Sequence, residues 1–262
     1  MLADSIFIIM ILTRNGNKRR IAHKIIPHFP QHKTFIELFF GAGGVFFSKK
    51  QADYSICNDI EDDIINLYLM LKTRQEELIN EITIMPVTES LLKYWNENTE
   101  IDPIKKAIRF LMLSNFGFLG QSSTLRFGQE GGNEKRLILT QINKTFELIK
   151  YVKFMNCDFR DVLGKIAFTE ANKKQAFIYS DPPYFQTVKY SEIWTEQDVN
   201  DCFDITFNSG VKGAMSEFDN PFILQQAKER GLNVIIIGER QNLKNRRTEI
   251  LITNYDLGLS LF

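Results

Sequence analysis

Residues 180–185 read SDPPYF, a short stretch whose residue types could hold a planar base. It follows an apolar run, QAFIYS (175–180), which has the length of a buried strand. Two prolines fix φ at successive residues, so Asp181, Pro182 and Tyr184 would keep one rigid arrangement. A base with an exocyclic amine could donate hydrogen bonds to the Asp181 carboxylate and the Pro182 carbonyl while it stacks on the Tyr184 ring. We expect these three residues to be catalytic, because the two acceptors favour the positive charge that develops on the amine nitrogen as it attacks a methyl group.

A second candidate site is the glycine loop FFGAGG (39–44), which follows another strand-like segment. Glycines let the backbone approach a ligand, and the N-terminus of a following helix would point at that ligand. The dinucleotide fingerprint G-x-G-x-x-G is incomplete, because Phe46 stands where its third glycine would fall. Asp59 ends the segment YSICNDI (54–60), where a carboxylate can accept hydrogen bonds from ribose hydroxyls. We therefore expect an adenosine-bearing cofactor and disfavour a nicotinamide oxidoreductase.

Strands that alternate with helices would position these residues. Strand patterns occur at 33–38, 54–60, 152–159, 175–180 and 233–238, and a helix pattern occurs at 220–231. Residues 248–255 alternate like a final edge strand. The pattern predicts an α/β fold, a doubly wound mostly parallel sheet with helices on both faces. Ligands of such a sheet bind outside the carboxyl ends of its strands, which is where Asp59 and Asp181 would lie.

An insertion interrupts this pattern. Residues 61–82 have the apolar spacing of one helix, and residues 104–133 start as a helix and then become rich in Gly, Ser, Asn and aromatic residues. We expect 10–60 and 151–262 to form the cofactor-binding catalytic domain and 61–150 to form a mainly helical insertion. Residues 1–9 would be an extension of the chain, with a short strand as the alternative.

Composition limits the classes of function. The 32 basic and 32 acidic side chains cancel, so a polyanion would be bound by local patches such as the eight Lys and Arg between residues 14 and 50. The three cysteines are far apart and lack metal-ligand spacing, which predicts a reduced intracellular protein, in the cytoplasm, without a metal site. The apolar run near residue 10 is too short to span a membrane.

Six motifs in order resemble those of the Dam-like adenine-specific DNA methyltransferases: NGNK (15–18), IELFFGAGGVFFSK (36–49), CNDI (57–60), NCDF (156–159), SDPPYF (180–185) and RRTEILITNY (246–255). The resemblance covers most of the chain. It implies a Rossmann-like methyltransferase fold, S-adenosylmethionine as the cofactor, and transfer of its methyl group to the exocyclic N6 amine of a flipped adenine in double-stranded DNA.

The resemblance also implies roles for single residues. Arg14, Asn15 and Lys18 would approach the amino-acid portion of the cofactor. The backbone of Phe40, Gly41, Ala42 and Gly43 would also contact the cofactor. Asp59 would bind the ribose, Asp158 and Phe159 the adenine ring, and Asp181 would border the reactive end. The residues alone leave a second interpretation for Asp158, as the N-cap of a helix that begins near Arg160.

The insertion is the expected target-recognition domain, with 114–133 nearest to the DNA. Asn115, Arg126 and Lys135 are the predicted DNA-binding residues, because polar and basic side chains suit base-edge and phosphate contacts. The alternative is a surface loop without a partner. The sequence leaves the oligomeric state and a cognate restriction endonuclease as a partner open.

Other functions remain open on the same fold. The methyl group could go to the N4 amine of cytosine in DNA, to RNA or to a protein amide. A catalytically silent nucleic-acid-binding protein would show a damaged aspartate or glycine loop, and both are intact here. The order of the motifs, with the insertion between the cofactor motifs and the aspartate loop, favours adenine in DNA.

Overall fold

The computed structural model describes residues 11–12, 14, 16–116, 133–185, 188–189, 192–241 and 246–256. The predicted extension at 1–9, Asn15 and Arg126 lie outside these ranges. The chain divides into two compact units, which we describe separately. The first unit takes in residues 1–20, 41–49 and 61–156, and the second takes in 21–40, 50–60 and 157–262.

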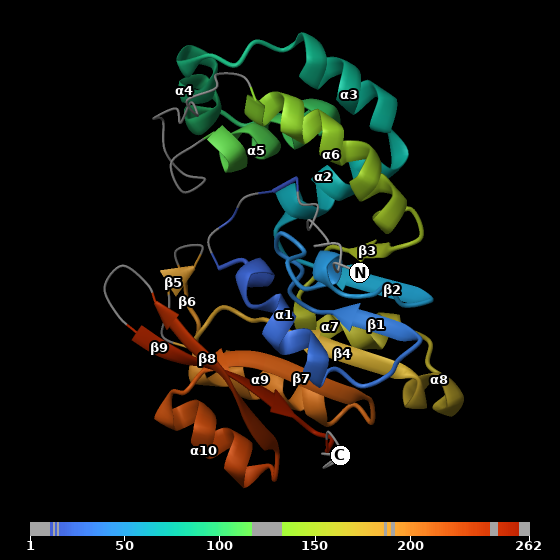
Figure 1. Cartoon of the computed structure of the whole chain (residues 1–262), viewed down its shortest axis with the longest axis vertical. Coiled ribbons are helices and arrows are strands. Elements are labelled where there is room, and N and C mark those ends of the chain that lie inside the picture. The colour runs from blue at the N-terminus through green and yellow to red at the C-terminus, as the bar shows by residue number, and fades with distance from the viewer. Residues whose placement is uncertain are drawn as a thin grey trace, which may run out of the picture. The chain divides into compact units, whose positions relative to one another are not determined.

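The first unit is mainly helical (Figure 1). Its elements are η1 (Lys18–Arg20), η3 (Phe46–Ser48), α2 (Asp62–Thr73), α3 (Gln75–Ile84), α4 (Glu89–Glu97), α5 (Pro103–Phe116), α6 (Asn133–Ile149) and the short strand β3 (Lys153–Met155). Helix α2 packs on α5, and α3 packs on α6. The unit also includes 41–49, so the predicted insertion 61–150 is only part of it, and its role as a recognition domain stays a prediction.

The predicted single helix at 61–82 is wrong, because the structure has two helices there. The chain leaves helical geometry at Arg74, where φ is −136° and ψ is 41°. The Arg74 N–H donates to the Met70 carbonyl at 2.7 Å and ends α2, and its guanidinium hydrogen-bonds Glu77 in the first turn of α3. The apolar spacing continues across the break, since Leu71, Leu78 and Ile82 are all fully buried.

The second unit contains a sheet with helices. Its elements are α1 (Ala22–Ile25), η2 (Ile26–His28), β1 (Thr34–Glu37), β2 (Tyr54–Asn58), α7 (Phe159–Val162), η5 (Leu163–Lys165), α8 (Glu170–Lys174), β4 (Ala176–Ser180), β5 (Val188–Lys189), β6 (Glu192–Ile193), α9 (Glu196–Phe207), β7 (Lys212–Phe218), α10 (Pro221–Glu229), β8 (Asn233–Gln241) and β9 (Arg246–Thr253).

Within this unit the strand order is β2-β1-β4-β7-β9-β8. Strand β1 is parallel to β2 and to β4, and β4 is parallel to β7, whereas β9 is antiparallel to both of its neighbours. The predicted mostly parallel sheet is therefore confirmed. The predicted edge position of residues 248–255 is wrong, because β9 lies between β7 and β8 and pairs on both sides.

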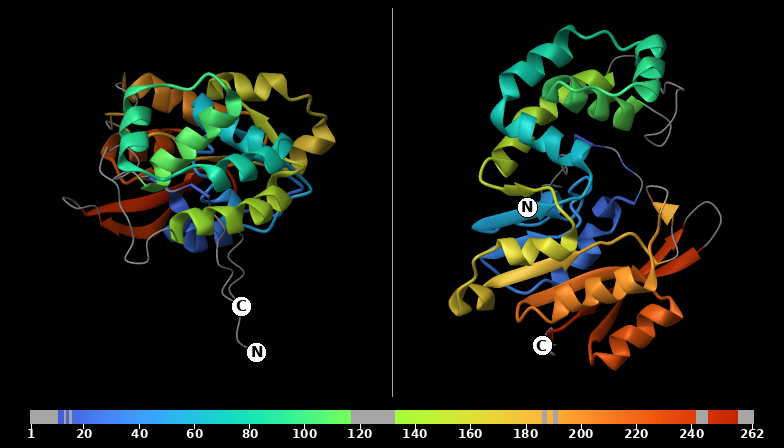
Figure 2. Two further views of the ribbon diagram at one scale, coloured as in Figure 1. Left: turned by 90° about the horizontal axis from the view of Figure 1, so that it is seen from above. Right: turned by 180° about the vertical axis from the view of Figure 1, so that it is seen from behind.

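Both faces of this sheet carry packed elements. On one face Phe29, just after η2, packs its ring 4.7 Å from Phe177 and 5.3 Å from Tyr179. On the other face the Ser180 hydroxyl lies 2.7 Å from the Thr206 hydroxyl of α9. Figure 2 shows α9 in front of the sheet when the molecule is seen from behind. Phe177, Ile178 and Tyr179 are completely buried, and each side chain of this kind stabilises the fold by about 1.5–3 kcal/mol.

Strand β7 shows why part of the sheet was not predicted. Its sequence, KGAMSEF, has small residues where a buried strand usually has branched ones. A Cβ at Gly213 would lie 2.2 Å from the Thr206 carbonyl oxygen, so α9 packs directly on the strand backbone. Small side chains are therefore required by the close approach of the helix. None of the helices among the described residues is long and apolar enough to cross a membrane.

Candidate functional site

The predicted site residues of the second unit lie at the carboxyl ends of three neighbouring strands. Phe39 and Phe40 follow β1, Asp59 follows β2, and Asp181 follows β4. The strands are in register, with Glu37 opposite both Cys57 and Tyr179. Neighbouring strands are about 5 Å apart, so Asp59 and Asp181 flank the end of β1 across about 10 Å. The chain order reverses between β1 and β4, and this switch point is where open α/β sheets bind their ligands.

Asn58 joins the ends of two of these segments. Its Nδ2 donates to the Leu38 carbonyl at 3.1 Å and to the Cys157 carbonyl at 3.0 Å. Its Oδ1 accepts from the Cys157 backbone N–H at 3.2 Å and from its thiol at 3.4 Å. The side chain is 1% exposed, so its polar groups depend on these partners. Because Asp59 and Asp158 are the next residues along the chain, Asn58 brings the two predicted acids to one place.

An aromatic cluster lies beside these acids. Phe39 lies 5.0 Å from Phe159 between ring centroids, and Trp194 lies 5.9 Å from Phe39 and 5.7 Å from Phe159. The Trp194 indole N–H is buried and has no hydrogen-bond partner among the described residues. A buried donor without a partner costs free energy unless a ligand supplies an acceptor. The cluster therefore suits a planar heterocycle with acceptor nitrogens.

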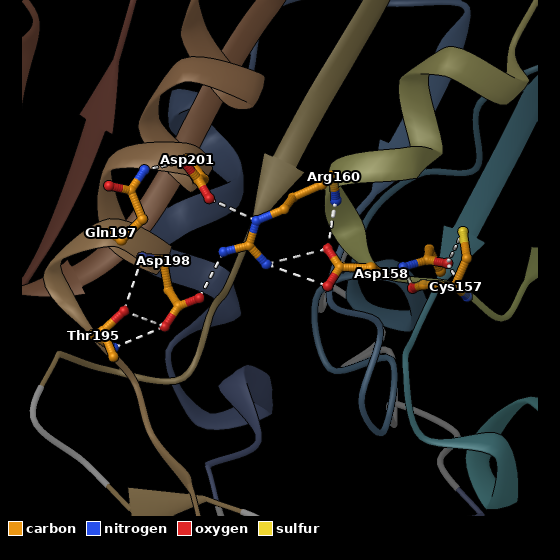
Figure 3. A network of polar contacts seen from close by, with 8 residues as sticks. Cys157, Asp158, Arg160, Thr195, Gln197, Asp198 and Asp201 are labelled. Atoms are coloured by element: carbon orange, nitrogen blue, oxygen red, sulfur yellow. Dashed lines mark hydrogen bonds and ion pairs between the residues drawn. The ribbon is translucent and has the colours of Figure 1, made fainter.

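Arg160 connects this region to α9 (Figure 3). Its guanidinium donates at 2.6 Å to Asp198 and at 2.6 Å to Asp201, pairs with Asp158 at 3.2 Å, and lies 4.5 Å from the Phe159 ring centroid. Partial burial lowers the pKa of Arg160, but the hydrogen bonds to Asp198 and Asp201 outweigh it and raise that pKa. The pKa of Asp201 is lowered, first by its hydrogen bond with Arg160. For Asp198, burial raises the pKa, but hydrogen bonds from Thr195 and Arg160 outweigh burial and lower it.

Asp158 takes the helix-capping position that the sequence left as an alternative. Its carboxylate accepts from the Arg160 backbone N–H at 2.9 Å at the start of α7. The same carboxylate is 39% exposed and so keeps access to solvent. The capping role and the predicted contact to a cofactor adenine are compatible, and the second stays a prediction.

The loop after β4 is held by two buried carboxylates that the sequence interpretation missed. The Tyr184 hydroxyl donates to Glu249 of β9, at 2.9 Å and 3.0 Å from its two carboxylate oxygens. The Phe185 backbone N–H donates to Glu217 of β7 at 2.9 Å. Glu217 and Glu249 are each 1% exposed. The loop that carries Asp181 is thus attached to the two strands that follow β4 in the sheet.

Other predicted cofactor residues belong to the first unit. Gly41 and Gly43 have φ of 54° and 71°, which favours glycine, and the Ala42 carbonyl accepts from Tyr68 at 3.4 Å. A Cβ at Gly44 would lie 2.1 Å from Asn17 Oδ1 and 3.0 Å from the Lys18 backbone nitrogen, so the glycine loop packs closely against the NGNK motif. Lys18 is 2% exposed, and Arg14 forms an ion pair with Glu61 at 2.8 Å.

The predicted DNA-binding residues that can be described have internal partners. Asn115 Nδ2 donates to the Ile11 carbonyl at 2.8 Å and to the Leu111 carbonyl at 2.9 Å. Lys135 Nζ donates to the Thr83 and Met85 carbonyls at 2.7 Å and 2.6 Å, where it stabilises the C-terminus of α3. Both residues therefore support the fold of the first unit, and their contacts to DNA stay predictions.

Residues 15–246 match the family described as D12 class N6 adenine-specific DNA methyltransferase. A DNA adenine methylase of Vibrio cholerae serotype O1 is 26% identical over 240 residues, which cover 84% of this chain and 78% of that protein. A DNA adenine methylase of Salmonella typhi is 29% identical over 184 residues, 64% of this chain and 62% of that protein. The type II methyltransferase M1.LlaDCHI of Lactococcus lactis subsp. cremoris is 24% identical over 271 residues, 92% of this chain and 93% of that protein.

Proposed function

The chain belongs to the D12 class N6 adenine-specific DNA methyltransferase family, and on this basis we propose that it transfers a methyl group, at the loop after β4, to an adenine turned out of the DNA duplex. Turning the base out costs a few kcal/mol of stacking and pairing, and stacking in a pocket recovers part of that cost. The loop at 181–184 is the proposed pocket for the base.

One observation carries this assignment: Asp181 directly follows β4 at the switch point of the sheet, in a loop that Glu217 and Glu249 hold. An adenine there would donate one N6 hydrogen to the Asp181 carboxylate and the other to the Pro182 carbonyl. As the nitrogen lone pair attacks, both N–H groups become more acidic and both hydrogen bonds strengthen. Acceptors fixed before the reaction stabilise this change without reorganisation.

S-adenosylmethionine is the cofactor, and when bound it supplies an electrophilic methyl group on a sulfonium centre. The residues at the strand ends fit such a group. Asp59 would accept hydrogen bonds from the ribose hydroxyls, Asp158 and Phe159 would border the adenine ring, and the backbone of Phe40 would contact the cofactor. The buried Trp194 N–H has no partner among the described residues, which suits an acceptor nitrogen of that ring. For the first unit, the sequence motifs assign Lys18 to the amino-acid portion and Gly41, Ala42 and Gly43 to backbone contacts with the cofactor, and these assignments stay predictions.

DNA is the substrate that the family implies, and we place the recognition of its sequence in residues 61–150. Arg126 is the predicted base or phosphate contact there. A cytoplasmic location and a partner endonuclease stay predictions from the sequence.

The test is to sequence methylated bases in DNA from cells that express the protein. We expect N6-methyladenine within one short recurring sequence. Asp181→Ala should lower the transfer rate by about 10²–10³-fold, because it removes a fixed acceptor from the transition state. Asp219→Ala, an exposed carboxylate just after β7, is the matched control and should keep the wild-type rate. Methylation of cytosine, or an Asp181→Ala protein with undiminished transfer, would overturn the proposal.

A further inference from the structure

Tyr184 is fixed by a pair of residues that lie opposite each other in the sheet. Phe218 of β7 and Glu249 of β9 are register partners in the antiparallel pair. The Phe218 ring lies 4.1 Å from the Tyr184 ring between centroids, and the Glu249 carboxylate accepts the hydrogen bond from the Tyr184 hydroxyl. Directly opposite residues project from the same face of a sheet. One cross-strand pair therefore contacts both the ring and the hydroxyl of Tyr184.

The two contacts restrict different motions of this side chain. Packing on Phe218 limits how far the ring can shift toward the sheet, and the hydrogen bond of the hydroxyl, which lies at the far end of the side chain, limits how far the ring can swing about the Cα–Cβ bond. Arg247 lies 5.4 Å from the centroid of the Phe218 ring and adds a cation–π contact to it. The Tyr184 side chain is half-buried, so part of it stays accessible.

We propose that Glu249 is a positioning residue for methyl transfer: through the Tyr184 hydroxyl it sets the angle of the ring against which the target adenine stacks. The inference rests on the proposed function, because it needs a base in the loop at 181–184. An adenine that stacks on a correctly angled ring presents its N6 hydrogens to Asp181 and Pro182. A ring free to tilt would still bind the base but would hold its amine out of line with the methyl group for more of the time.

This role predicts an effect on kcat rather than on KM, because the ring remains a stacking surface when its angle is not fixed. Tyr184→Phe keeps the ring and removes the hydroxyl. We expect it to lower kcat about tenfold, which corresponds to about 1.4 kcal/mol, with KM for DNA within about twofold of wild type. Glu249→Ala removes the same hydrogen bond and should lower kcat by at least as much. Glu249→Gln keeps an acceptor oxygen for the Tyr184 hydroxyl and should restore kcat to within about threefold of wild type.

A double-mutant cycle separates positioning from a general loss of stability. Tyr184→Phe combined with Glu249→Ala should lower kcat no further than Glu249→Ala alone, because both changes remove the hydrogen bond between Tyr184 and Glu249. Glu217→Ala is the matched comparison, since it removes the other buried carboxylate of this region, which accepts from the backbone N–H groups of Phe185 and Phe218. Its effect on kcat should multiply with that of Tyr184→Phe. Both kcat and KM are measured by methylation of duplex DNA that contains the target site found by sequencing methylated bases.

The outcomes distinguish this inference from the proposed function. If the wild-type protein methylates adenine in an Asp181-dependent way but Tyr184→Phe keeps the wild-type kcat, the positioning role is wrong and the proposed function stands. Independent, multiplying effects of Tyr184→Phe and Glu249→Ala would also overturn it. Should Glu249→Ala fail to fold, the comparison of Tyr184→Phe with Glu249→Gln decides the question, because equal tenfold losses in both would contradict rescue by the retained acceptor. A wild-type protein that methylates no adenine would overturn the proposed function itself.

Discussion

Replacing Asn58 by Asp should destabilise the second unit strongly at neutral pH. In the wild-type protein, Asn58 Nδ2 donates to the Leu38 carbonyl at 3.1 Å and to the Cys157 carbonyl at 3.0 Å. Aspartate places a carboxylate oxygen there, which is an acceptor and cannot donate to either carbonyl. Two lost hydrogen bonds cost about 1 kcal/mol each, and the unpaired buried charge adds more. We expect the free energy of unfolding to fall by about 3–5 kcal/mol at pH 8.

The pH dependence of Asn58→Asp tests the cause. The neutral carboxylic acid can donate to one of the two carbonyls, and burial disfavours the charged form, so the pKa of the introduced group should rise in the folded protein. Its destabilising effect is then complete above the raised folded-state pKa and decreases as the pH falls toward about 3.9, the unfolded value. Urea unfolding at pH 8 and pH 5 should show a smaller difference from wild type at pH 5.

An exposed amide provides the control for this experiment. Asn98 Nδ2 donates to the Tyr94 carbonyl at 2.8 Å at the C-terminus of α4, where the side chain is exposed. Asn98→Asp should change the free energy of unfolding by less than about 1 kcal/mol. The reasoning would be refuted by an Asn58→Asp protein that is as stable as wild type at pH 8. It would also be refuted if the loss in free energy of unfolding were as large at pH 5 as at pH 8, because Asn58 would then not be required as a donor to two buried carbonyls.

Three further predictions concern other contacts. Gly44→Ala should lower the free energy of unfolding by about 1–3 kcal/mol and weaken binding of S-adenosylmethionine measured by calorimetry, because the new Cβ atom would overlap Asn17. Gly164→Ala is the control, since a Cβ atom there would have no neighbour within 4 Å. The folded-state pKa values of Asp198 and Asp201 are lowered, so the stability that these carboxylates contribute is present above about pH 4 and is lost as the pH falls further. In urea unfolding at several pH values, Asp198→Asn should reduce the fall in the free energy of unfolding below about pH 4. A fall as steep as in wild type would contradict this prediction. Complete burial raises the pKa of Cys202 to about 12, so a thiol reagent at pH 8 should modify the partly exposed Cys157 in the native protein and Cys202 only after unfolding, and equal rates would contradict the burial.

The sequence predicted the parts of the site that local pattern determines. Asp59 and Asp181 each follow a short apolar run, and the positions of β1, β2 and β4 could be read from those runs. Gly41 and Gly43 marked a turn because their backbone adopts positive φ. These features depend on a few neighbouring residues, so the pattern that predicts them is contained in a short window.

The remaining features depend on contacts between distant segments. Strand β7 has small residues because α9 packs on it at Gly213, and the sequence KGAMSEF alone does not indicate that a helix packs there. Glu217 and Glu249 look like surface acids until β7 and β9 are placed beside the loop after β4. The break at Arg74 could not be predicted from the sequence, because the apolar residues keep the same helical spacing on both sides of it. An odd charge inside an apolar strand, as in TEILIT, is the one signal that could have pointed to Glu249.

The internal position of β9 has a consequence for the order in which the protein becomes active during its synthesis. Strands β1, β2 and β4, with Asp59 and Asp181, are complete once residue 181 has been made. Glu249 is added to the chain 68 residues after Asp181, and β9 must pair with β7 before the Tyr184 hydroxyl acquires its carboxylate acceptor. A nascent chain that folds from its N-terminus would therefore assemble the strands for the cofactor well before the loop for the base is held. Until β9 is placed, such a chain has both acids of the site but lacks the carboxylate that binds the Tyr184 hydroxyl.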